Sequence, residues 1–255
     1  MTFKKNTLSN IYYRWRSNYK VFNWISIFDN IYTLDDKLYL RYQYTTLLYD
    51  EKNKNNYWHK HIIWISPIFI KILQETPHLY IDATYISTKD YYQLVIIMAY
   101  YTLIDLKFPC SYILMNNKNE KSYELVFKNL LNIITMDNSI DLKIISITTD
   151  FEKGILNAVK TVFKNIRHVG CMFHYIKNLR LNLLKIGLIN NDISNITEEL
   201  LKNLGTIPFK INDNPNIIEE IFKRFESQYK GTDYIKNFKR FEKYIYDTWI
   251  YYINN

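Results

Sequence analysis

The sequence predicts an α/β fold in which a mixed sheet is followed by a helical region. Three observations indicate this. Three strand-like segments, rich in β-branched and aromatic residues, follow one another from about residue 78. Helical and strand patterns then alternate up to about residue 188, as expected for parallel βαβ units. Strand signals disappear beyond that point. The chain of 255 residues, 48% of them hydrophobic, can bury a sizeable core.

Composition narrows the class of protein and its compartment. The net charge of +8 suggests a polyanionic partner, although the 24 Tyr, 5 Gly and 5 Pro indicate a compositional bias that also enriches Lys. Two cysteines exclude a disulfide scaffold and suit a reducing compartment. The N-terminus MTFKKNTLSN lacks the apolar segment of a signal peptide, and the longest apolar run, 91–104, is too short to span a bilayer. We therefore expect a non-secreted protein without a membrane partner.

Residues 1–76 form a lead-in region of mixed character. Its segment NIYYRWRSNYKVFNW, Asn10–Trp24, has two interpretations. It is either an amphipathic helix that packs on its neighbours or a DNA-contacting surface. In the second interpretation Tyr13 or Trp15 stacks on bases, and three basic side chains contact phosphates: Arg14, Arg16 and Lys20. Strand-like pieces (KLYLRYQYTTLLYD and HIIWISP) and a short helix, PIFIKILQE, then lead into the core.

The core begins with three strands. They are predicted over 78–86, 91–104 and 110–117, joined by turns at STKD and DLKFP, with Pro109 just before the third strand. Short turns between successive strands predict an antiparallel meander.

Helices and strands then alternate. The segment 121–135 has apolar residues at helical spacing, and 143–150 is a short apolar strand of the kind buried on both faces. A helix over 152–163 and a fifth strand over 166–174 follow. The next helix, 175–187, ends at Gly187, a favoured C-cap residue.

The predicted order is β-β-β-α-β-α-β-α, with right-handed crossovers in a five-stranded mixed sheet. This is the strand order of the ribonuclease-H-like fold. We assign residues 77–188 to that core and residues 189–255 to a helical region. Its helices are predicted over 195–205, 216–231 and 235–253, separated by glycines and prolines: Gly205, Pro208, Pro215 and Gly231.

Two acidic residues are candidates for a metal site. Asp150 ends a strand just before a helical pattern, where it would also serve as an N-cap for a helix that begins at Phe151. Asp82 lies inside an otherwise apolar strand, where a carboxylate is costly unless it is paired or bound to a cation. Because the crossover returns the fourth strand beside the first, both carboxylates are expected at one place. Such a pair favours a cation, and Mg²⁺ prefers a few carboxylates plus water and phosphate.

The motif CMFH, Cys171 to His174, provides a C-x2-H pair. Zinc takes about four ligands, and the other Cys and His residues form no second close pair, so structural zinc is not expected. One interpretation has Cys171 filling space and His174 ending a strand. The other places His174 beside the two acids, where it contacts a phosphate or orients a ligand.

Several segments resemble the core of Mutator-like element (MULE) transposases, which belong to the DDE group and have a ribonuclease-H-like catalytic domain. These segments are YIDATY, Tyr91–Leu94, ITTDFEKGILNAVKTVF and HVGCMFHYIKNL. The resemblance extends over about residues 40–255, and its most specific part runs from Asp150 to Leu179.

The resemblance implies roles for individual residues. Asp82 matches the first catalytic acid, Asp150 the second, and Cys171 and His174 the C-x2-H motif of the family. The implied activity is Mg²⁺- or Mn²⁺-dependent cleavage and strand transfer at transposon ends. The implied partner is double-stranded DNA, bound by a homo-oligomer, without a small-molecule substrate. A nuclear or cytosolic location follows, with the nucleus favoured. In the helix after His174, two basic residues are further candidate DNA contacts: Lys177 and Arg180.

The sequence departs from the family at the third catalytic acid, a Glu that follows a helical insertion and an Asn-rich lead-in. The tail FEKYIYDTWIYYINN resembles the end of that insertion, and the sequence ends before such a Glu. We assign this role to none of the tail glutamates, which we interpret as solvated helix residues: Glu219, Glu220, Glu226 and Glu242. We therefore expect strand transfer to be absent or very low. Two other functions stay open: a non-catalytic, transposase-derived DNA-binding protein, and a nuclease of the same fold with another third acid.

Overall fold

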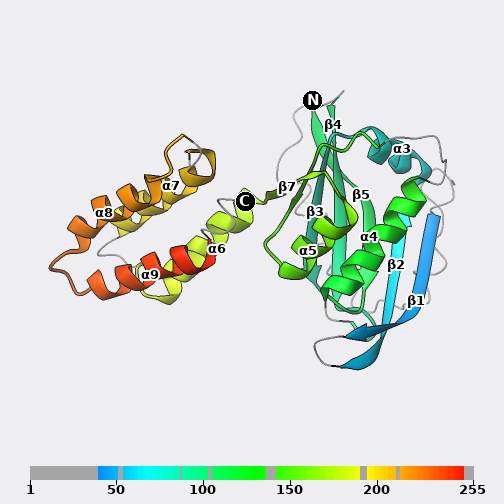
Figure 1. The fold of residues 1–255 in the computed structure, drawn as a ribbon, viewed down its shortest axis with the longest axis horizontal. Helices are drawn as coiled ribbons and strands as arrows, with labels where there is room; N and C mark the ends of the chain where they lie inside the picture. Colours follow the sequence, from blue (N-terminus) through cyan, green and yellow to red (C-terminus); the bar gives the residue numbers. More distant parts are fainter. Residues whose placement is uncertain are drawn as a thin grey trace, which may run out of the picture.

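The computed structural model describes residues 40–50, 54–86, 88–102, 105–135, 142–189, 194–210 and 213–249. The segment Asn10–Trp24, with the candidate DNA contacts Arg14, Arg16 and Lys20, lies outside these residues. Within the described part, a mixed sheet carries helices on one face, and further helices follow it to one side (Figure 1). Over the same residues, no helix is both long and apolar enough to cross a bilayer.

The sheet has seven strands in the described residues, in the order β1-β2-β5-β4-β3-β6-β7. β3 pairs in parallel with β6, and β6 with β7, whereas the other pairs are antiparallel. The predicted meander and the placement of the fourth core strand beside the first are thus confirmed. The strands span β1 (Leu40–Asp50), β2 (Asn55–Ile65), β3 (His78–Tyr85), β4 (Gln93–Tyr101), β5 (Leu106–Met115), β6 (Ser146–Thr149) and β7 (Arg167–Gly170).

Two details of the predicted sheet are wrong. The sheet was expected to have five strands, but β1 and β2 extend it beyond β5, because the apolar side chains of Ile63 and Ile65 complete the same buried face. The third core strand was expected to begin after Pro109, but β5 already begins at Leu106. Pro109 is accommodated at a register shift, a position where a missing N–H disrupts no regular ladder.

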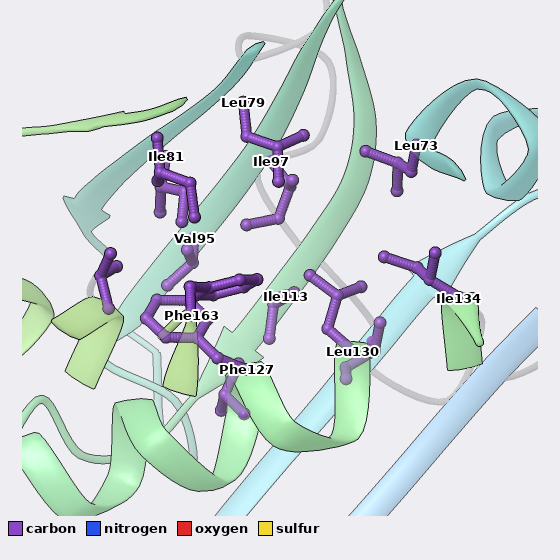
Figure 2. Packing of buried hydrophobic residues seen from close by; sticks show 14 of the residues in the cluster. Leu73, Leu79, Ile81, Val95, Ile97, Ile113, Phe127, Leu130, Ile134 and Phe163 are labelled. Carbon is purple, nitrogen blue, oxygen red and sulfur yellow. The ribbon is translucent and has the colours of Figure 1, made fainter. Parts of the chain in front are cut away.

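One face of the sheet is covered by α3 (Pro67–Glu75), α4 (Glu120–Ile134) and α5 (Lys153–Val162). Alternate side chains of β3 and β4 point toward these helices, as the period of a strand requires. Figure 2 shows the packing of this first hydrophobic cluster, where the rings of Phe127 and Phe163 lie with their centroids 5.8 Å apart. Labelled members include Leu73, Leu79, Ile81, Val95, Ile97, Ile113, Leu130 and Ile134.

The second hydrophobic cluster is formed by the helices α6 (Met172–Lys185), α7 (Ser194–Lys210), α8 (Ile217–Tyr229) and α9 (Ile235–Thr248). These helices lie beside the sheet and are reached through β7 (Figure 1). The helix α6 ends at Lys185, and the predicted terminating glycine, Gly187, follows two residues later with a φ of 76°. The N–H of Gly187 donates to the Leu184 carbonyl and that of Leu188 to the Leu183 carbonyl, a Schellman motif.

The helix α7 was expected to end at Gly205 and Pro208, but it continues to Lys210. A proline at 208 cannot donate to the carbonyl of Leu204 four residues earlier. The hydroxyl of Tyr175 in α6 donates to that carbonyl instead, at 3.2 Å. Gly205 has no side chain to hold α6 away, since a Cβ there would lie 3.0 Å from Ile176 Cδ1. Contacts from a neighbouring helix therefore offset the local breaking signals.

Candidate active site

Asp82 lies in the middle of β3, on the face of the sheet that points away from α4 and α5. Leu79 and Ile81 are buried, whereas the Asp82 side chain is 54% exposed. The interpretation of Asp82 as a carboxylate inside a buried strand is therefore wrong, because its side of the strand faces away from the core. Ile81 pairs with Thr149, the last residue of β6, and in both segments the next residue is an aspartate. The structure thus brings Asp82 and Asp150 together.

Asp150 follows β6 and lies in a tight turn before α5. Its Oδ1 accepts the backbone N–H of Glu152 at 3.0 Å, and Glu152, not Asp150, is the N-cap residue of α5. The predicted helix start at Phe151 is thus wrong, because the Asp150 carboxylate closes an Asx turn that delays the helix until Lys153. Burial raises the pKa of Asp150, the Glu152 N–H and His174 lower it, and the charge of Asp82 raises it.

His174 lies in the first turn of α6, not at the end of a strand. The fifth core strand was expected to run through His174, but β7 ends at Gly170 and Cys171 becomes the N-cap residue of α6. The N–H of Cys171 donates to the Thr149 carbonyl at 2.7 Å, which ties the start of α6 to the end of β6. His174 Nε2 lies 3.9 Å from Asp82 Oδ1. The structure therefore brings His174, Asp82 and Asp150 to one place.

Glu152 is a neighbour of this site that sequence reasoning did not identify. Its Oε1 accepts a hydrogen bond from the Tyr123 hydroxyl of α4 at 3.3 Å. Burial and the charge of Asp150 raise the pKa of Glu152, whereas Lys118 and the Tyr123 hydroxyl lower it. The only sequence signal for it is its position, two residues after Asp150 on the same turn.

The tail glutamates lie on α8 and α9, where each has a partner on the helical surface. Glu219 pairs with Lys223 at 2.7 Å, and Glu220 accepts a hydrogen bond from the Asn214 side chain at 2.9 Å. Lys239 joins the other two, at 2.8 Å from Glu226 and 2.9 Å from Glu242. These pairings match the interpretation of all four as acids of helix surfaces.

The candidate DNA contacts of α6 differ in their surroundings. Lys177 is exposed, three residues beyond His174. Arg180 forms an ion pair with Glu198 of α7 at 2.9 Å, so a phosphate would have to compete with that carboxylate. Lys177 is therefore the more accessible of the two cations.

The donor atoms at the site fit some metal ions better than others. In the described ranges, no group of three or more His, Cys, Asp or Glu side chains is arranged to hold a metal. The charges of Asp82 and Asp150 on adjacent strands affect each other, and one Asp150 oxygen already accepts a backbone N–H. Mg²⁺ suits such a site, since it uses one or two carboxylates together with water and phosphate oxygens. A tetrahedral zinc site would need more protein ligands.

The fold and site define an α/β protein with a mixed sheet, in which one aspartate lies within β3 and another directly follows the neighbouring parallel strand β6. Residues 78–178, from the first residue of β3 into α6, match the family model described as the MULE transposase domain. This part of the chain is thus a MULE transposase domain, which indicates a function of the transposase type. No curated protein matches the chain.

Proposed function

We propose that residues 78–178 are the ribonuclease-H-like catalytic core of a MULE-type transposase, which cleaves DNA and transfers its strands with the help of Mg²⁺ or Mn²⁺. The observation that carries this proposal is the proximity of Asp82, within β3, to Asp150, just after the neighbouring strand β6, with His174 Nε2 3.9 Å from Asp82 Oδ1. The family match over the same residues supports it.

The residues at the site have separable roles in this proposal. Asp82 and Asp150 would hold the metal, which supplies activation of the attacking oxygen and stabilisation of the leaving oxygen. Asp82, more than half exposed, is open to a substrate phosphate. Asp150 is oriented by the N–H of Glu152. The imidazole of His174 faces the acids and orients the phosphate. Because two carboxylates leave the metal geometry loose, we expect weak cleavage and strand transfer from this chain alone.

A Mn²⁺ titration followed by thermal unfolding tests the metal site. Mn²⁺ that binds the folded state raises the midpoint of unfolding, by several degrees when its concentration reaches about 100 times the dissociation constant. We expect this rise to disappear in Asp82→Asn and in Asp150→Asn. Asp213→Asn, an exposed acid before α8, is the matched control and keeps the response. A rise that persists in both site variants, or no rise in the wild-type protein, contradicts the proposal.

DNA binding without cleavage is a second candidate function. The net charge of +8 and the exposed Lys177, on the helix that carries His174, favour it. Duplex binding that falls steeply with salt but does not depend on Mn²⁺, Asp82 or Asp150 would support this candidate over the first. Nicking that both Asn substitutions abolish would support the first. In either case we propose that the chain acts on duplex DNA in the nucleus, as a homo-oligomer.

A further inference from the structure

The ring of Phe151, the residue after Asp150, lies between Gly170 of β7 and Trp249, the residue after α9, and we call this site the socket. A Cβ at Gly170 of β7 would lie 2.5 Å from Phe151 Cζ, so the ring rests directly against the glycine backbone. The ring of Trp249, after α9, meets Phe151 edge to face with centroids 4.7 Å apart. Trp249 also meets Tyr175 of α6 at 4.8 Å and is 3% exposed.

This socket joins the second hydrophobic cluster to the turn that carries Asp150. Phe151 packs against the cluster formed by α6 to α9, although it lies between β6 and α5 in the sequence. On the other side of the same turn, Glu152 is held by the Tyr123 hydroxyl of α4. The turn that carries Asp150 is therefore held at two points. Glu152 contacts α4, which covers the sheet, and Phe151 contacts the helical cluster of α6 to α9.

We propose that Phe151 is a positioning residue, through which the helices α6 to α9 set the orientation of the Asp150 carboxylate. Because β6 ends at Thr149, Asp150 lies beyond the regular ladder. The turn is therefore held by local contacts such as the Phe151 ring and the hydrogen bond from the Thr149 hydroxyl to the Asp150 carbonyl at 2.7 Å. The hydrogen bond from the Glu152 N–H to Asp150 Oδ1 forms only while the turn keeps its shape. Displacement of the ring would allow the turn to change shape and the Asp150 carboxylate to move. A shift of about 1 Å at a reacting group lowers the rate of reaction strongly. The expected effect on metal binding rests on the proposed function, whereas the expected effect on the shape of the turn does not.

Hydrogen exchange of the Glu152 amide, measured by NMR without metal, tests the proposal. We expect this amide to lose protection in three variants. Phe151→Ala removes the ring, Trp249→Ala removes its aromatic partner, and Gly170→Ala displaces the ring. Phe238→Leu is the control, because Phe238 is buried in the same cluster but stacks on Tyr229, with ring centroids 4.7 Å apart. The control destabilises the helices without touching Phe151 and keeps the Glu152 amide protected. Unchanged protection in the three socket variants, or equal loss in the control, overturns the proposal.

A compensating pair separates positioning from general damage to folding. In the Phe151→Leu background the smaller side chain leaves room for a Cβ at 170, so adding Gly170→Ala should change Glu152 protection little. The same Gly170→Ala change in the wild-type background should remove protection. Equal effects in both backgrounds would show that Gly170 and Phe151 act independently, against the proposal.

Mn²⁺ binding then relates the socket to the metal site. Loss of a residue that orients a metal ligand typically weakens binding by about 10- to 100-fold, and we expect Phe151→Ala and Gly170→Ala to fall near the lower end. Phe238→Leu should bind Mn²⁺ like the wild type. If the wild-type protein binds no Mn²⁺ but the socket variants expose the Glu152 amide, the proposed function fails and this inference stands. If Mn²⁺ binds through Asp82 and Asp150 while the variants change neither readout, only this inference fails.

Discussion

One oxygen of the Asp150 carboxylate accepts the Glu152 N–H, and the group as a whole is partly withdrawn from water. Burial therefore opposes its ionised form, and the neighbouring charge of Asp82 adds to the cost. A divalent cation between the two carboxylates would remove both penalties. Asp82, by contrast, is largely hydrated. At the residue scale, the two acids of the pair thus differ: Asp150 is the oriented carboxylate and Asp82 the accessible one.

Gly154 is a residue at which an added methyl group is not tolerated. A Cβ there would lie 2.7 Å from the Lys118 carbonyl oxygen and 3.2 Å from the Tyr123 ring. Because backbone must move to make room, we expect Gly154→Ala to lower the free energy of unfolding by about 1–3 kcal/mol. Urea unfolding measures this. Gly205→Ala is the comparison and should cost less, since its Cβ would lie 3.0 Å from the movable end of the Ile176 side chain and not against backbone. A Gly154→Ala protein as stable as the wild type would contradict the tight packing of α5 on α4.

The buried pair His59 and His61 predicts a loss of stability in mild acid. Both side chains are fully buried in β2, with His59 Nε2 3.0 Å from His61 Nδ1. Burial lowers the pKa of His59 to about 4, and burial together with the charge of His59 lowers that of His61 to about 3. The unfolded chain takes up these protons near pH 6.5. Stability is thus full above this pH and falls as pH drops toward 4, by up to about 2.7 kcal/mol per pH unit for two protons.

Urea unfolding between pH 7.5 and pH 5 checks this slope. The double variant His59→Asn, His61→Asn should show a flatter dependence. Part of the slope remains because burial also lowers the pKa of His168, and a lowered histidine pKa acts in the same direction. An equal slope in the two proteins would mean that the pair is hydrated or already charged in the folded state.

At the scale of elements, α7 shows that contacts with a neighbouring helix can keep a segment helical although it contains a glycine and a proline. Pro208 lacks the N–H that the Leu204 carbonyl requires, and Gly205 weakens the same turn. The Tyr175 hydroxyl of α6 satisfies that carbonyl, and the missing side chain at Gly205 lets α6 approach. The helix is therefore continuous only in the presence of its neighbour.

The Tyr175 hydroxyl can be tested with a pair of substitutions in α6 and α7. Tyr175→Phe leaves the buried Leu204 carbonyl without a donor and should cost about 1–3 kcal/mol of unfolding free energy. Adding Pro208→Ala restores a backbone N–H four residues after Leu204, so the cost of Tyr175→Phe should be much smaller in that background. A double-mutant cycle by urea unfolding measures the coupling. Additive effects would show that the Tyr175 hydroxyl does not replace the missing N–H.

At the scale of the whole molecule, the two large clusters of buried side chains come from different parts of the sequence. One joins the sheet to α3, α4 and α5, and the other joins α6 to α9. The chain passes between them once, from β7 into α6, and Phe151 reaches back across. Such an arrangement favours local opening of one cluster while the other stays folded.

Hydrogen exchange by mass spectrometry tests this division. Phe225 is fully buried in the helical cluster and Phe127 in the sheet cluster, and truncation of either to Ala should cost about 3–5 kcal/mol. We expect Phe225→Ala to speed exchange in α7 to α9 more than in β3 and β4, and Phe127→Ala to do the reverse. Equal acceleration of both regions by both variants would indicate a single cooperative unit.

The sequence by itself determined the order of the core elements and the proximity of the two aspartates. Apolar periodicity is a local property, so it located β3, β4, α4, β6 and α5, and the rules of crossover connections placed β6 beside β3. The identity of the domain also followed from short motifs, as the family match over 78–178 confirms.

Only the tertiary structure decided how the side chains at the site are held. Which side of β3 carries Asp82, the Asx turn that delays α5, and the place of His174 on a helix depend on contacts that periodicity does not encode. The same holds for β1 and β2 in the sheet and for α7 beyond Pro208. The socket of Phe151 joins residues almost a hundred positions apart, Phe151 and Trp249. Such contacts become favourable only after the chain between the two residues has folded, so no local sequence pattern predicts them.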